Sequence, residues 1–224
     1  MGDAIGQMLP SAVGVAISPL PIVAVVLMLV TERARVNGPA FVLGWWLGIA
    51  IVGGIVLAVS SGAEASDEGE PATWVSILEL ILAAGLLLLA VKQWTSRPAR
   101  GEEAEAPAWM STLDSFTPVK SGGTAALLSG VNPKNLLLVV AGATAIARTG
   151  ISGGEQAIAL VVFILIASLG VMTPVVLYFV LGTKSREMLD GLKDWLAGNN
   201  ATIMAVLLLI LGVKLLGDAI SGLT

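Results

Sequence analysis

The segment SGVNPKNLLLVV, residues 129–140, places a proline and a lysine inside a run of apolar residues long enough to cross a bilayer. Asn132 is of a type favoured just before a helix, and Pro133 suits the first helical position, where a missing N–H costs nothing. The run therefore predicts two half-helices. Lys134 lies about eleven residues into the span, or ~16 Å at ~1.5 Å per residue. A charge at that depth points to function unless a buried partner neutralises it.

Six such runs fill most of the 224 residues, of which 56% are hydrophobic and 12% charged. Each run reaches or passes the ~20 residues that a membrane-spanning helix needs. The first run has no basic segment before it and is too long for a signal-peptide core, so we expect it to be retained. We expect an all-α integral membrane protein with six transmembrane helices, at 8–30, 39–60, 74–94, 123–147, 157–181 and 201–220.

The residue types that the chain lacks narrow its chemistry. It has no Cys and no His, which removes thiolate nucleophiles, the usual metal ligands and the commonest proton relay. Its basic residues form no extended stripe of the kind that binds nucleic acid. No paired carboxylates lie within the expected spans. We therefore expect no enzyme activity, no cofactor, no metal and no nucleic-acid partner.

The Lys and Arg residues predict how the chain is oriented, because cytoplasmic loops carry the excess of positive charge. One side of the expected spans carries Arg33, Arg35, Lys92, Arg97, Arg100, Lys120, Lys184, Arg186 and Lys193. The other side carries Arg148 alone, while Lys134 and Lys214 lie within spans. We expect a multi-pass protein of the cytoplasmic (inner) membrane with both termini external and an external acidic loop at 64–70.

Two parts of the chain resemble each other. ILAAGLLLLAVK at 81–92 matches IMAVLLLILGVK at 203–214, and Ser18-Pro19 corresponds to Asn132-Pro133. The pattern predicts a three-helix repeat used twice, with the second copy inverted, as in many secondary transporters. Ordinary likeness between Leu-rich helices is the alternative. The expected domains are a first repeat at 1–95, a cytoplasmic linker at 96–122 and an inverted second repeat at 123–224.

Both proline breaks favour a negatively charged guest. Pro19 and Pro133 each remove a backbone donor and free a carbonyl, and in lipid such groups must be buried in protein or face a wet cavity. The second half-helices would aim two positive dipole ends at a common place, where Lys134 adds a full charge. The alternative for the prolines is a packing kink. The alternative for Lys134 is a structural ion pair with Glu79, the acidic residue that lies well inside an expected span.

Other residues have simpler interpretations. Lys214 can reach the outer interface beside Asp218, four positions on, and is expected to anchor its helix. Gly44 and Gly48 have the G-x-x-x-G spacing of closely packed membrane helices. That face suits a homodimer and suits packing within one subunit equally well.

The chain resembles the GAP family, also called Sap or sulfolipid-1-addressing proteins, of the lysine exporter (LysE) superfamily. The resemblance is carried by SPLPIVAVVLMLVTERARVNGPAFVLGWWLG at 18–48 and SGVNPKNLLLVVAGATAIA at 129–147, and it runs over nearly the whole chain. In actinobacteria such proteins are implicated in moving large surface glycolipids out of the cytoplasmic membrane. The resemblance therefore implies lipid export, with the family's marked positions falling on Ser18, Pro19, Pro21, Asn132, Pro133, Lys134 and Asn135.

Three hypotheses of function follow. The first is a transporter that exports or flips a glycolipid or anionic lipid toward the cell envelope, without ATP because no Walker motif is present. The second is an exporter of small metabolites or ions such as amino acids. The third is a scaffold that does not transport and docks lipid-synthesis or lipid-export machinery through the linker at 96–122.

Overall fold

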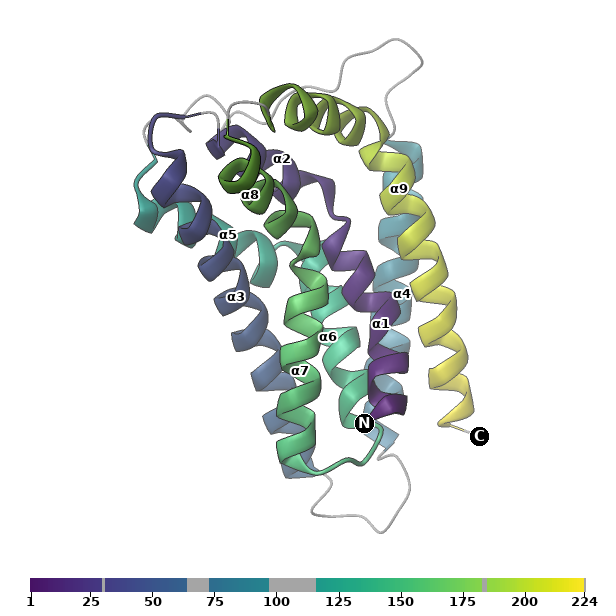
Figure 1. Cartoon of the computed structure of the whole chain (residues 1–224). Coiled ribbons are helices and arrows are strands. Elements are labelled where there is room, and N and C mark those ends of the chain that lie inside the picture. Colours follow the sequence, from purple (N-terminus) through teal and green to yellow (C-terminus); the bar gives the residue numbers. More distant parts are fainter. Residues whose placement is uncertain (30, 64–72, 97–115, 183–184, 224) are drawn as a thin grey trace.

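Every regular element described in the computed structural model is an α-helix. The structure describes residues 1–29, 31–63, 73–96, 116–182 and 185–223. Its helices are α1 Gly2–Ala16, α2 Pro19–Leu29, α3 Ala34–Ala63, α4 Thr73–Thr95, α5 Pro118–Gly130, α6 Pro133–Ala147, α7 Gly153–Ala167, α8 Leu169–Leu181 and α9 Ser185–Ser221 (Figure 1).

The helices agree with a multi-pass membrane protein. Within the described residues α3, α4 and α9 are each long and apolar enough to cross a membrane. Up to six crossings result if each bent pair counts as one span: α1 with α2, α5 with α6 and α7 with α8, bent by 50°, 63° and 59°. The outer surface carries apolar side chains that suit lipid better than water. On α3 these include Leu43, Leu47, Ile51 and Ile55.

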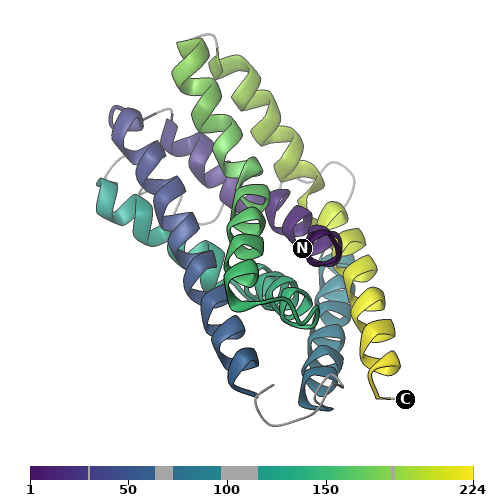
Figure 2. The same cartoon turned by 60° about the horizontal axis from the view of Figure 1, so that its bottom comes forward.

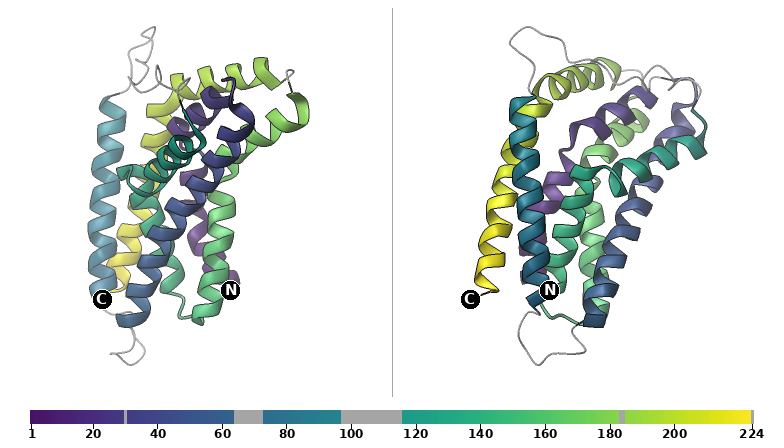
Figure 3. Two further views of the ribbon diagram at one scale, coloured as in Figure 1. Left: turned by 90° about the vertical axis from the view of Figure 1, so that its left-hand side faces the viewer. Right: turned by 180° about the vertical axis from the view of Figure 1, so that it is seen from behind.

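The helices form an elongated bundle with both termini at one end (Figure 1). The turn from α6 to α7 lies at that end. The end of α2, the start of α3 and the end of α8 lie toward the other. The helices α4 and α9 pack side by side along one flank, and α3 packs on α5 along the opposite flank (Figure 3). Figure 2 shows α1, α6 and α7 between these flanks. The start of α9 runs across one end of the bundle before the helix turns along it (Figure 1).

Two of the three bends lie at the predicted prolines, since α2 begins at Pro19 and α6 at Pro133. The third bend, between α7 and α8, falls in the expected span at 157–181, for which Pro174 predicts a kink, but the break itself lies at Ser168, before the proline. The Ser168 hydroxyl donates to the Ile164 carbonyl oxygen at 2.5 Å, and such bonds back to the preceding turn bend helices. Pro174 lies within α8, where its ring excludes the carbonyl four residues earlier, so the distortion falls on its N-terminal side.

The second half of the chain becomes helical earlier than expected. The α5 helix begins at Pro118, before the expected span start at residue 123, and the Thr117 side chain caps it by accepting a hydrogen bond from the Lys120 N–H at 3.3 Å. The last residues of the expected linker at 96–122 therefore belong to a helix. Residues 97–115 of that linker and the expected acidic loop at 64–70 lie outside the described residues.

The Gly44 and Gly48 face packs against α5 of the same chain. A Cβ atom at Gly44 would overlap the backbone of Gly122, and one at Gly48 would overlap the Ser129 hydroxyl and the Ala126 carbonyl. The two helices therefore approach backbone to backbone, as small residues allow. This face is occupied within the subunit, and a homodimer through another surface stays a prediction.

We predict that Gly44→Ala destabilises the protein by about 1–3 kcal/mol, because the added methyl forces α3 away from α5. Gly54→Ala on the same helix is the matched control, since a Cβ there meets nothing within 4 Å. Thermal unfolding of both variants in the same detergent measures the difference. Equal unfolding temperatures would show that α3 and α5 do not touch at Gly44.

Candidate functional site

The first break, between α1 and α2, is buried. Ser18 is 4% exposed, and Pro19 and Pro21 are buried with it. Neither proline has a backbone N–H, so among the first three residues of α2 only Leu20 can donate. The positive end of this half-helix is therefore weaker than that of an ordinary helix.

The second break, between α5 and α6, replaces its lost backbone bonds with side-chain bonds. The Asn132 N–H donates to the Leu127 carbonyl at 3.0 Å, which leaves the Leu128 carbonyl without its helical donor. The Asn135 side chain supplies that donor through Nδ2 at 2.8 Å. The Asn132 side-chain oxygen accepts from the Lys134 N–H at 3.1 Å, as the sequence predicts for a residue that caps α6. Asn135 is fully buried, and its Oδ1 has no hydrogen-bond partner among the described residues.

The two breaks lie at one level on neighbouring segments. A Cβ atom at Gly14 in α1 would lie 3.2 Å from Leu138 Cδ1 in α6. Gly14 is one turn before Ser18, Leu138 is one turn after Lys134, and α1 and α6 run in opposite directions along the bundle (Figure 1). The fold thus brings to mid-bundle both predicted groups, Ser18, Pro19 and Pro21 in one segment and Asn132, Pro133, Lys134 and Asn135 in the other.

Lys134 has no acidic partner in the described part of the chain. Its side chain is half-buried at the start of α6 and makes no hydrogen bond or ion pair with another described residue, while its backbone N–H donates to the Asn132 side chain. A Lys ammonium within a bilayer usually pairs with a carboxylate or extends to the interface. The described chain leaves this cation without a counter-charge.

Glu79 pairs with Arg148, so an ion pair between Glu79 and Lys134 is not formed. Arg148 Nη1 donates to Glu79 Oε2, and the two side chains are 18% and 1% exposed. Arg148 follows the C-terminal end of α6, whereas Lys134 lies at the other end of that helix, about 20 Å away at ~1.5 Å per residue. Arg148 was missed as a partner, although it is the lone basic residue on its side of the expected spans.

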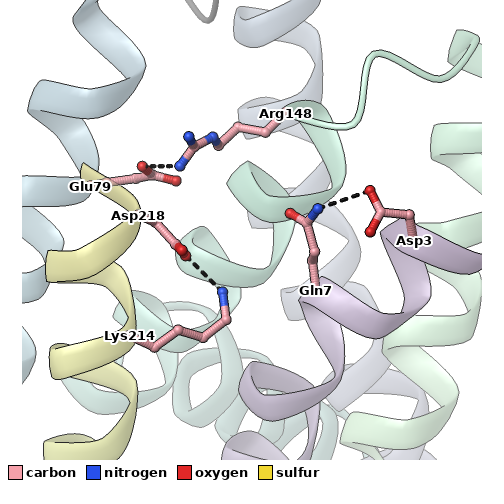
Figure 4. A network of polar contacts seen from close by, with 6 residues as sticks. All are labelled: Asp3, Gln7, Glu79, Arg148, Lys214 and Asp218. Atoms are coloured by element: carbon pink, nitrogen blue, oxygen red, sulfur yellow. Dashed lines mark hydrogen bonds and ion pairs between the residues drawn. The ribbon is translucent and has the colours of Figure 1, made fainter. Parts of the chain in front are cut away.

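A second ion pair lies beside the first. Lys214 Nζ and Asp218 Oδ2 are 2.7 Å apart on α9, which confirms the predicted contact. Figure 4 shows Glu79, Arg148, Lys214 and Asp218 gathered close together. We call these four residues the charge cluster. It joins α4, the end of α6 and α9, and its two cations and two carboxylates balance.

An apolar groove lies where the α1–α2 and α7–α8 bends meet α9. Its volume is about 640 Å³. It is lined by Val13, Ala16, Ile17, Ile22, Ile166, Leu169, Gly170, Thr173, Trp195 and Ile203. No sequence signal could have found it, because all but Thr173 of the lining residues are ordinary apolar residues, and they come from three separate segments. Lys134 is not among them.

Apolar helices, bent spans and a surface of exposed aliphatic side chains indicate a multi-pass helical membrane protein. The chain belongs to the family of Sap, sulfolipid-1-addressing protein, whose family model matches residues 8–221. This match confirms the family that the sequence resembles, and the wider lysine exporter superfamily stays a prediction. No curated protein and no solved structure matches the chain.

We predict that Arg148→Met destabilises the protein by about 3–5 kcal/mol, because it leaves the buried Glu79 carboxylate without a partner. Adding Glu79→Leu to that variant should recover most of the loss, since it removes the stranded charge. Lys214→Met is the matched control, because it removes a cation from a more exposed ion pair. It should lower the free energy of unfolding by no more than about 1 kcal/mol. Thermal unfolding in detergent compares the three variants. An Arg148→Met protein as stable as the parent would contradict the pairing.

Proposed function

We propose that this protein exports or flips a lipid with an anionic or sugar-bearing headgroup across the cytoplasmic membrane toward the cell envelope. Lys134 is the observation that carries the proposal. An ammonium at mid-bundle without a partner in the described chain favours a guest that supplies the negative charge. The family name, which refers to a sulfolipid, supports the same class of guest.

The proposed site lies between the two proline breaks. Ser18, Pro19 and Pro21 would line one side of it, and Asn132, Pro133, Lys134 and Asn135 the other. The unpaired Oδ1 of Asn135 offers an acceptor for a sugar hydroxyl. With α2 short of backbone donors, Lys134 rather than paired helix dipoles would supply most of the attraction for an anion.

The proposed mechanism is alternating access between two inverted three-helix repeats. The first would contain α1–α2, α3 and α4, and the second α5–α6, α7–α8 and α9. Two observations support this division: each half begins with a pair bent at a proline, and the last helices of the halves, α4 and α9, pack against each other. A site at the interface of such repeats opens to one side and then the other as the repeats rock.

We predict that Lys134→Met lowers flipping of an anionic lipid about 10- to 100-fold, the loss expected for one charge-assisted contact. The fold should stay intact or become steadier, because the change removes an unpaired charge from the membrane. Dye-labelled phosphatidylglycerol in reconstituted vesicles, with a membrane-impermeant quencher outside, measures the rate. Lys92→Met near the end of α4 is the matched control and should flip lipid normally.

The same vesicles separate this proposal from the other hypotheses. Amino-acid transport without lipid flipping would favour the metabolite exporter. Normal flipping by the Lys134→Met variant would remove the anion site from the mechanism. A protein that moves neither guest, yet whose loss in cells blocks surface display of lipid, would favour the scaffold.

We predict that the end of the bundle that carries the termini is external, so that a reagent added outside the cell reaches this end and not the other. Ser66→Cys and Ser96→Cys place single thiols in a chain that has no other cysteine. A membrane-impermeant maleimide added to intact cells should label the thiol at position 66 and leave the one at position 96 unlabelled until the membrane is broken. The reverse pattern would invert the predicted orientation.

A further inference from the structure

The apolar groove exists because two bent spans meet. Ala16 and Ile17 lie where α1 ends, Leu169 and Gly170 lie where α8 begins, and α9 closes the side with Trp195 and Ile203. The α1 and α8 backbones are in direct contact at Ala16 and Gly170, because a Cβ atom on Gly170 would overlap the Ala16 carbonyl oxygen. The bends thus fix two small residues in contact and leave the larger space beside them unfilled.

The groove has few polar side-chain groups. The Thr173 hydroxyl donates to the Leu169 carbonyl at 2.7 Å, and Trp195 adds a single indole N–H donor. Ser168, between the two half-helices, likewise donates to Ile164. A stably bound water needs about two to four polar partners, and a small polar metabolite or an ion needs at least as many. The single indole N–H of Trp195 does not meet that need.

The groove opens on the apolar outer surface of the bundle. Among its lining residues Val13, Leu169 and Trp195 are 40%, 56% and 59% exposed. In a bilayer the aliphatic side chains of Val13 and Leu169 face hydrocarbon, whereas Trp195 precedes the apolar span of α9 at Ala201–Ser221. An acyl chain can therefore enter sideways from the side of Val13 and Leu169. The volume of about 640 Å³ also falls within the range of about 300–1,000 Å³ found for small-molecule sites.

We propose that this groove binds an acyl chain of the guest lipid and enters the transport cycle as the site for the lipid tail. The inference rests on the proposed function for its guest, and it adds a second site separate from Lys134. Because a chain leaving the bilayer for the groove exchanges one apolar medium for another, binding should be weak. The groove would orient the tail while the headgroup crosses.

The test uses phosphatidylglycerol with a diazirine near the end of one acyl chain, in vesicles of phosphatidylcholine and phosphatidylglycerol that contain the full protein. After illumination, crosslinked peptides are mapped by mass spectrometry. We expect crosslinks at groove residues in α1 and α8 in clear excess over the exposed α3 surface. Crosslinks spread evenly over lipid-facing residues would mean surrounding lipid only, and crosslinks between two copies of the chain would mean a dimer contact. Either result overturns the proposal.

Filling the groove tests the same idea with matched variants. Ile166→Trp and Thr173→Trp should each reduce the groove crosslinks and slow lipid flipping several-fold, whereas Leu43→Trp on the outer surface of α3 should change neither. Thr173 is exposed, so its variant remains informative if the Ile166 variant folds poorly. Unchanged groove crosslinks in a folded Thr173→Trp protein would overturn the acyl-chain site.

The outcomes separate this inference from the proposed function. Flipping that depends on Lys134 without any groove crosslinks would remove the acyl-chain site and leave the transporter in place. Groove crosslinks in a protein that flips no lipid would keep the acyl-chain site and remove the transporter. Lys134→Met should leave the groove crosslinks unchanged, because the ammonium does not line the groove.

Discussion

A helix that breaks inside a bilayer must find hydrogen-bond partners within the protein for the backbone groups that the break frees. Much of this fold supplies such partners or buries the breaks. The Leu128 carbonyl, left free where α5 ends, receives the Asn135 side chain. The break between α1 and α2 is instead buried, and its two prolines reduce the number of donors that need partners. Parts of the broken segments, α1, α6 and α7, thus lie between the flanks, and the long helices α3, α4 and α9 lie on the flanks (Figure 2).

The charges of the spans fall into two groups with different surroundings. Glu79 and Arg148 neutralise each other near one end, with Lys214 and Asp218 beside them. Lys134, at mid-bundle, has no charged partner among the residues that the structure describes. Pairing makes the charge cluster a means of joining helices, whereas an unpaired ammonium must gain its compensation elsewhere. The same residue types therefore support a structural interpretation at one depth and a binding hypothesis at another.

The sequence was informative where local chemistry decides the structure. Apolar run lengths predicted the crossings, and an Asn before a proline predicted the capped break at Asn132. The sequence was uninformative where contacts between distant segments decide the structure. The partner of Glu79 depends on where α6 ends relative to α4, and the groove depends on two bends meeting α9. The bend at Ser168 depends on a hydroxyl bond that Ser residues make in many unbent helices.

The contact of Gly44 with Gly122 has a mechanical consequence. Two backbones that touch without side chains between them leave no clearance for one helix to slide or roll over the other. We therefore expect α3 and α5 to stay in fixed contact although they belong to different halves of the chain, so that the rocking of the proposed repeats is not a rigid-body motion of whole halves. Any conformational change of the protein would then be concentrated at the three bends, which would act as hinges.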